Sequence, residues 1–177
     1  MWSNIWGAID WDNNIWVYRE LYVKHLTAEQ LADKILEAEE LDPLPHYTVL
    51  DSSCWNKTGF GPSIAETMMR AGVRWTPSDR NRLQGKMEIH RRLADDPYSN
   101  EPRLRIFSKC KHIVAQLSGI PLSKTNSEDV DTKAEDHAYD ALRYMVMTRM
   151  SGYQSIHKTL QGIKEQAFQP FDNTFGY

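Results

Sequence analysis

The chain has 177 residues, of which 41% are hydrophobic, with two cysteines and a formal net charge of −3 at pH 7. This length fits one domain with an ordinary apolar core, and the weak negative charge argues against a general basic coat for nucleic acid, although a local basic patch stays open. Cys54 and Cys110 lack the spacing of metal ligands. No apolar run approaches the ~18 residues of a membrane span, and no secretory signal is found. We therefore expect a cytoplasmic protein without a membrane partner.

Residues 4–24 have the pattern of a β-hairpin. Segments 5–11 and 15–23 are rich in Ile, Val, Trp and Tyr, and the Asp-Asn-Asn sequence between them favours a turn. Asp10 and Asp12 are carboxylates that could be catalytic. A hairpin turn accounts for both of them, and we favour this structural role.

The middle of the chain alternates between helical and strand patterns. Thr27 and Gln30 form a capping-box pattern, which begins a helix that ends near residue 41. The later expected elements are strands at 46–51, 73–76 and 103–107 and helices at 62–71, 81–94 and 110–119. This order predicts an α/β fold in which one mixed sheet is covered by helices on both faces.

Two groups of polar side chains are candidates for a cation site. Asp51 ends the strand predicted at 46–51, where open α/β sheets usually place their chemistry, although an Asp that begins a turn is also common. Asp136, His137 and Asp140 lie within one helical turn, ahead of an apolar stripe typical of a core-facing helix. Carboxylates suit Mg²⁺ or Mn²⁺, whereas acidic residues at a helix N-terminus also stabilise the helix without any ligand. A cation site needs ligands from both groups.

The most basic part of the chain is the helix predicted at 81–94. Arg82 and Lys86 recur at helical spacing on this segment, and Arg80 precedes them. These side chains could contact DNA phosphates. An ordinary solvated helix is an equal alternative.

The order and spacing of these motifs resemble the nuclease domain of the terminase large subunit of tailed phages and prophages, from about Ile9 to Arg149. The segments that carry the resemblance are 10–20 (DWDNNIWVYRE), 49–51 (VLD), 81–85 (NRLQG), 128–131 (EDVD) and, most specifically, 135–144 (EDHAYDALRY).

This resemblance implies an RNase H-like fold and an endonuclease that cuts concatemeric double-stranded DNA during packaging with Mg²⁺ or Mn²⁺. Asp51 matches the carboxylate that ends the family's central strand. Asp136, His137 and Asp140 match the acidic or histidine positions that open its last helix. The portal protein and the small terminase subunit are implied partners, and the host bacterial cytoplasm is the implied location.

The chain departs from the family pattern at its beginning. The family's first strand carries another catalytic Asp and precedes the hairpin, so that strand would lie before Met1, and no phosphate loop of the family's ATPase domain is present. We therefore expect an N-terminally truncated nuclease domain over residues 1–150, a tail over 151–177, weak metal binding and slow or absent cleavage. Two alternatives stay open: another RNase H-like nuclease of the resolvase type, and a non-catalytic module for DNA binding or capsid assembly.

Overall fold

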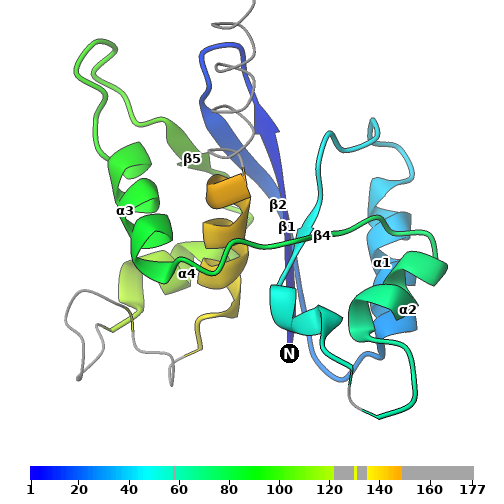
Figure 1. Cartoon of the computed structure of the whole chain (residues 1–177). Coiled ribbons are helices and arrows are strands. Elements are labelled where there is room, and N and C mark those ends of the chain that lie inside the picture. The colour runs from blue at the N-terminus through cyan, green and yellow to red at the C-terminus, as the bar shows by residue number, and fades with distance from the viewer. Residues whose placement is uncertain (58, 122–129, 131–134, 149–177) are drawn as a thin grey trace, which may run out of the picture.

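The computed structural model describes residues 1–57, 59–121, 130 and 135–148 (Figure 1). Strands β1 (Trp2–Ile9) and β2 (Ile15–Val23) form an antiparallel hairpin, and β5 (Leu104–Ile106) pairs in parallel with the other edge of β2. The strand order of this sheet is β1-β2-β5. A separate two-stranded parallel sheet contains β3 (Val49–Leu50) and β4 (Thr76–Pro77).

The helices begin close to the predicted starts, and capping side chains lie at three of these starts. The described helices are α1 (Ala28–Glu39), α2 (Ile64–Arg70), α3 (Arg82–Leu93), α4 (Lys111–Gly119), the short 3-10 turn η1 (Ser52–Trp55) and a helix over residues 137–148. Thr27 and Ser63 each form a full capping box, and the Asn81 side chain accepts the backbone N–H of Gln84. These local hydrogen bonds fix the helix starts.

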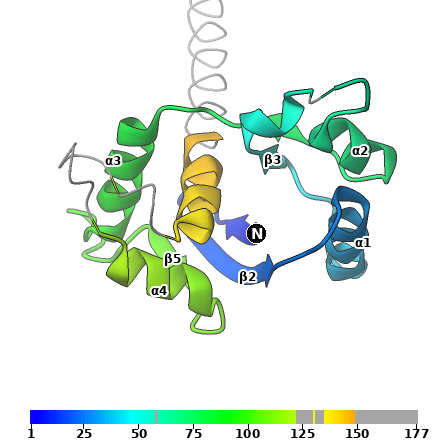
Figure 2. The ribbon, with the colours of Figure 1, turned by 90° about the horizontal axis from the view of Figure 1, so that it is seen from below.

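Two apolar clusters cover the two faces of the hairpin. On one face, β2 and β5 pack against α3, α4 and the 137–148 helix through residues such as Ile15, Ile113 and Leu142. On the other face, Trp6 of β1 packs against α1 and α2, with Ile35 in the same cluster. Figure 2 shows α1 and α2 on one side of the hairpin, and α3 and α4 on the other. The predicted α/β class, with helices on both faces of the hairpin, is confirmed.

The predicted mixed sheet is present as β1-β2-β5, but among the described residues two of the expected strands lie outside it in a second sheet. The strand expected at 46–51 shortens to the two residues of β3, and the strand expected at 73–76 moves to Thr76–Pro77. Val73 instead lies in the apolar cluster beneath α1. Among the described residues, β3 pairs with β4 and not with the edge of β1.

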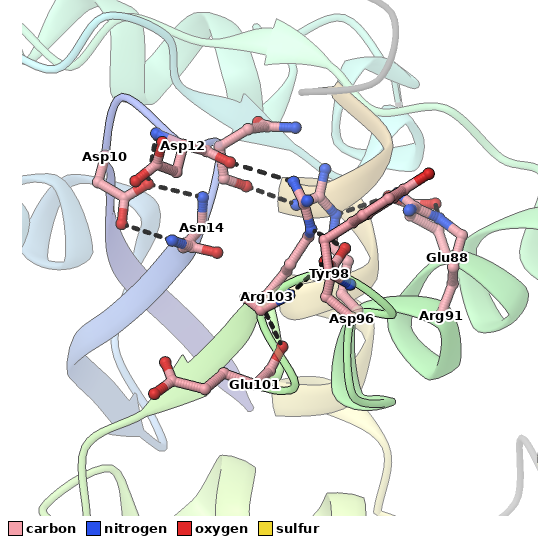
Figure 3. Close-up of polar contacts among 12 residues, drawn as sticks. Asp10, Asp12, Asn14, Glu88, Arg91, Asp96, Tyr98, Glu101 and Arg103 are labelled. Atoms are coloured by element: carbon pink, nitrogen blue, oxygen red, sulfur yellow. Dashed lines mark hydrogen bonds and ion pairs between the residues drawn. The ribbon is translucent and has the colours of Figure 1, made fainter.

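Asp10 organises the turn of the hairpin (Figure 3). Its Oδ1 atom accepts the backbone N–H groups of Asp12 and Asn14 at 3.1 and 2.8 Å. Its Oδ2 atom accepts the Asn14 side chain at 2.8 Å and the Trp16 indole N–H at 3.1 Å. Arg103 donates to the carbonyl of Asp12. These contacts support the structural role that we favour for Asp10 and Asp12.

We expect the Asp10 contacts to make stability depend on acid pH. The hydrogen bond from Asn14 is the main cause that lowers the pKa of Asp10 from 3.8 to about 2 in the folded chain. A lowered folded pKa stabilises the protein fully above the unfolded pKa, and this contribution is lost as pH falls through the window from 3.8 to about 2. In thermal unfolding across this window, Asp10→Asn should show a shallower fall of Tm than the wild type.

Asp96 and one control variant complete this test. Arg103 lowers the pKa of Asp96 to about 2 as well, so part of the pH dependence should persist in Asp10→Asn. Asp33→Asn removes an exposed carboxylate on α1 and makes the same change of charge. If Asp10→Asn kept the full wild-type dependence on pH, the proposed contribution of Asp10 would be wrong.

Candidate functional site

Asp51 lies at the point where β3 ends and η1 begins. Its Oδ1 atom accepts the backbone N–H of Ser53 at 2.8 Å, and its Oδ2 atom accepts the hydroxyl of Tyr144 at 3.0 Å. Burial acts to raise the pKa of Asp51, but the hydrogen bonds from Ser53 and Tyr144 outweigh it, so that the pKa lies below its ordinary value. The side chain is therefore a carboxylate at neutral pH with a fixed orientation.

Asp136 and Asp140 lie at the start of the 137–148 helix. The carbonyl of Asp136 accepts the backbone N–H of Asp140 at 2.8 Å, which places Asp136 at the helix cap. Burial, followed by repulsion from Asp140, raises the pKa of Asp136, and the nearby Arg82 opposes this shift. Arg82 of α3 lies 3.7 Å from Asp136 and 3.4 Å from Asp140, measured between guanidinium nitrogen and carboxylate oxygen.

Two consecutive residues of the 137–148 helix contact the two acidic groups. Arg143 donates from Nε to Oδ1 of Asp140 at 3.1 Å, and Tyr144 donates to Asp51. The Arg143 guanidinium also lies 4.5 Å from the centre of the Tyr144 ring, at a distance typical of a cation–π contact. Arg143 and Tyr144 therefore hold Asp51 and Asp140, which come from different elements, in one arrangement.

Gly85 of α3 makes room for Arg143. A Cβ atom at this position would lie 2.9 Å from Cδ of Arg143 and 3.2 Å from Cγ of Met147, both closer than ordinary contacts. The close approach of α3 to the 137–148 helix thus requires a residue without a side chain.

Gly85→Ala should lower the free energy of unfolding by about 1–3 kcal/mol, because overpacking outweighs the better helix propensity of Ala. The measurement is chemical unfolding. Gly61→Ala is the control, because a Cβ there would meet nothing within 4 Å. Equal or higher stability of Gly85→Ala relative to the wild type would contradict the close packing.

One cavity of about 530 Å³ brings the predicted acidic groups together. Asp51, His137, Asp140 and Tyr144 all line it, whereas Asp136 does not. Within the described ranges, no group of three or more His, Cys, Asp or Glu side chains is close enough to hold a metal ion. The structure therefore places Asp51, His137 and Asp140 around one space, without assembling them into a closed cluster.

The predicted DNA-binding residues have different surroundings. Arg82 contacts Asp136 and Asp140, so its charge compensates the acidic group. Arg80 is exposed and donates to the hydroxyl of Ser52, the residue after Asp51. Lys86 is half-buried on α3. Arg80 and Arg82 thus have different partners, and DNA contact by Arg80, Arg82 and Lys86 stays a prediction.

Sequence patterns pointed to the acidic residues but not to the groups that hold them. The role of Tyr144 could be suspected from its place four residues after Asp140, on the same helix face. No sequence pattern indicated that Arg82 lies beside Asp140, because 58 residues separate the two.

Comparison of the chain with models of protein families, with curated proteins and with solved structures finds no match. The resemblance to terminase nucleases therefore rests on the sequence motifs. In the part of the chain that the structure describes, no helix has the length and apolar character to cross a bilayer.

Proposed function

We propose that the chain is a metal-dependent DNA endonuclease domain with an RNase H-like fold, related to the nuclease of terminase large subunits. One observation carries this proposal: a carboxylate at the end of a strand, Asp51, and a carboxylate in the first turn of a helix, Asp140, line one cavity. Tyr144 lies one helical turn after Asp140, and its hydroxyl donates a hydrogen bond to Asp51. Chemistry at the carboxyl end of a strand is common in α/β proteins.

The donor atoms fit a hard divalent cation. Asp51 and Asp140 offer carboxylate oxygens, which suit Mg²⁺ and Mn²⁺, and the exposed His137 adds a nitrogen donor that favours Mn²⁺. Asp136 is buried beside Arg82 and is the least accessible of the predicted ligands. When bound, such a cation supplies an activated water and stabilises the leaving oxygen in phosphodiester hydrolysis.

The chain's own residues prepare the site in three ways. Tyr144 orients Asp51, and Arg143 orients Asp140, each through a hydrogen bond. Arg82 and Arg143 compensate the carboxylate charge, which would otherwise repel the phosphates of DNA. Arg80 is exposed beside Ser52, where it is free to contact a phosphate near Asp51. Double-stranded DNA is thus the proposed substrate, and the portal protein and small terminase subunit are proposed partners in the bacterial cytoplasm.

Nicking of supercoiled plasmid tests this proposal. We expect slow nicking that requires Mn²⁺, stops with a chelator and is lost in Asp51→Ala. Asp33→Ala, which removes an exposed carboxylate on α1, should nick like the wild type. Preference for a four-way junction over duplex DNA would favour a resolvase-type nuclease instead. Nicking that survives Asp51→Ala would contradict the proposal, and so would a wild-type chain that shows neither nicking nor binding of Mn²⁺.

A further inference from the structure

One polar residue lies on the core-facing side of α4. Gln116 follows Ile113 by three residues and precedes Leu117, and both of these apolar side chains belong to the cluster that covers β2. Residues three and four positions apart share one face of a helix, and the face toward the core is usually apolar. A half-buried amide at such a position needs hydrogen-bond partners, because unpaired polar groups are costly to bury. Gln116 finds these partners at the helix over residues 137–148, which we call the site helix.

The side chain of Gln116 bonds directly to the start of the site helix. Its Oε1 atom accepts the backbone N–H groups of Ala138 at 2.8 Å and Tyr139 at 3.0 Å. Its Nε2 atom donates to the hydroxyl of Tyr22 at 3.2 Å, and that hydroxyl donates in turn to Glu135 at 2.9 Å. Both ends of the amide therefore have partners, which fixes the direction in which its oxygen points. In both views of the ribbon, α4 lies beside this helix start (Figures 1 and 2).

The two N–H groups that Gln116 binds are those that an N-cap side chain usually binds. Asp136 is the N-cap of the site helix, since its carbonyl accepts the N–H of Asp140 in the first bond of the helix. An aspartate at this position normally accepts, with its own carboxylate, the N–H groups two or three residues later. Those residues are Ala138 and Tyr139. The cap is thus supplied by α4 in place of the aspartate of the site helix itself.

The carboxylate of Asp136 lies beside Arg82. The two side chains are 3.7 Å apart between guanidinium nitrogen and carboxylate oxygen, and the same guanidinium lies 3.4 Å from Asp140. The side chain of Asp136 is only 12% exposed, so it is held within the acidic group of the candidate site. Because Arg82 is shared between two carboxylates, Asp140 keeps part of its negative charge for another cation.

We infer that Gln116 is a positioning residue for the candidate site, which caps the site helix in place of Asp136 and so keeps the Asp136 carboxylate beside Arg82. Without Gln116, this carboxylate would turn back onto the N–H groups of its own helix, as N-cap aspartates usually do. Arg82 would then pair with Asp140 alone, and Asp140 would be less available to a metal ion. The capping role rests on hydrogen-bond geometry, whereas the effect on a metal ion rests on the proposed function.

Amide hydrogen exchange of the full chain, measured by NMR without metal, tests the capping role. In Gln116→Leu, the Asp136 carboxylate should replace the lost acceptor and keep part of the protection of Ala138 and Tyr139. Asp136→Ala should therefore leave the exchange of these two amides unchanged when Gln116 is present, but speed it by at least about tenfold in the Gln116→Leu background. The amide of Val146, later in the same helix, corrects for changes in the stability of the whole helix. An effect of Asp136→Ala that is equal in both backgrounds would overturn the inference.

Calorimetric titration with Mn²⁺ tests the effect on the candidate site. Gln116→Leu should weaken Mn²⁺ binding by about tenfold, which is at the lower end of the usual effect of removing a group that orients a metal ligand. It should cause no further loss in a chain that already carries Asp136→Ala, because Gln116 acts through Asp136. Gln84→Leu makes the same chemical change at an exposed position of α3 and should bind Mn²⁺ like the wild type.

The two measurements separate failure of this inference from failure of the proposed function. A wild-type chain that binds no Mn²⁺ would contradict the proposed metal site, and the exchange experiment would still decide the capping role. Wild-type Mn²⁺ affinity in Gln116→Leu, or an equal loss of affinity with and without Asp136→Ala, would overturn the role of Gln116 at the site.

Discussion

Glu88→Ala is expected to lower the free energy of unfolding by about 3–5 kcal/mol, which would make it one of the most destabilising single substitutions in the chain. Glu88 is only 5% exposed, and Arg92, its partner on the next turn of α3, is 2% exposed. Oε1 of Glu88 accepts Nε of Arg92 at 2.6 Å, and Arg91 also bonds to the carboxylate. Without Glu88, the Arg92 guanidinium would stay buried, and among the described residues the carbonyl of Asn13 would be its remaining hydrogen-bond acceptor.

Chemical denaturation compares this variant with a matched exposed pair. Lys34 and Glu37 on α1 are 2.7 Å apart but are both more than half exposed, so Glu37→Ala should lower the free energy of unfolding far less than Glu88→Ala does. The double variant Glu88→Ala/Arg92→Met should regain part of the loss, because it removes the uncompensated charge as well. Similar denaturation midpoints for Glu88→Ala and Glu37→Ala would contradict the proposed role of the buried pair.

Tyr144→Phe is expected to weaken Mn²⁺ binding by about 10–100-fold, the usual effect of removing a group that orients a metal ligand. The substitution deletes only the hydroxyl that donates to Asp51, and it keeps the ring beneath the Arg143 guanidinium. The measurement is calorimetric titration with Mn²⁺. The expected change is in affinity, whereas a purely structural role would change stability alone.

Tyr22→Phe is the control for this experiment. The hydroxyl of Tyr22 donates to Glu135 at 2.9 Å and accepts from Gln116, and Tyr22 does not line the cavity that contains Asp51. Its Mn²⁺ affinity should equal that of the wild type. Wild-type affinity in a folded Tyr144→Phe protein would show that the hydroxyl does not orient a metal ligand.

Local features of the fold were predictable because they depend on neighbours in sequence. Thr27 caps a helix that begins where its capping-box pattern places it, and Asp10 occupies the predicted hairpin turn. The pairing of β3 with β4 was harder to predict, since a two-residue strand carries almost no periodic signal. The separation of the two sheets depends on which edges meet in space, and no local pattern encodes that.

In the candidate site, too, residues marked by a local pattern were predictable, whereas contacts between distant residues were not. Asp51 and Asp140 could be selected from their places at a strand end and a helix start, and both line one cavity. A charge pattern shows that Arg82 is a cation but not that Asp136 and Asp140 lie beside it, so the structure adds these contacts while DNA contact by Arg82 stays a prediction. The bond from Tyr144 to Asp51 joins residues 93 positions apart, so only the folded chain reveals it.

The most direct test of the central claim is a calorimetric Mn²⁺ titration of the wild type, Asp51→Ala, Asp140→Ala and the double variant. If the two carboxylates share a cation, either single substitution should remove most of the binding, and the double variant should lose little more. Binding that is unchanged in both single variants, or that falls by independent and additive amounts, would contradict a shared site.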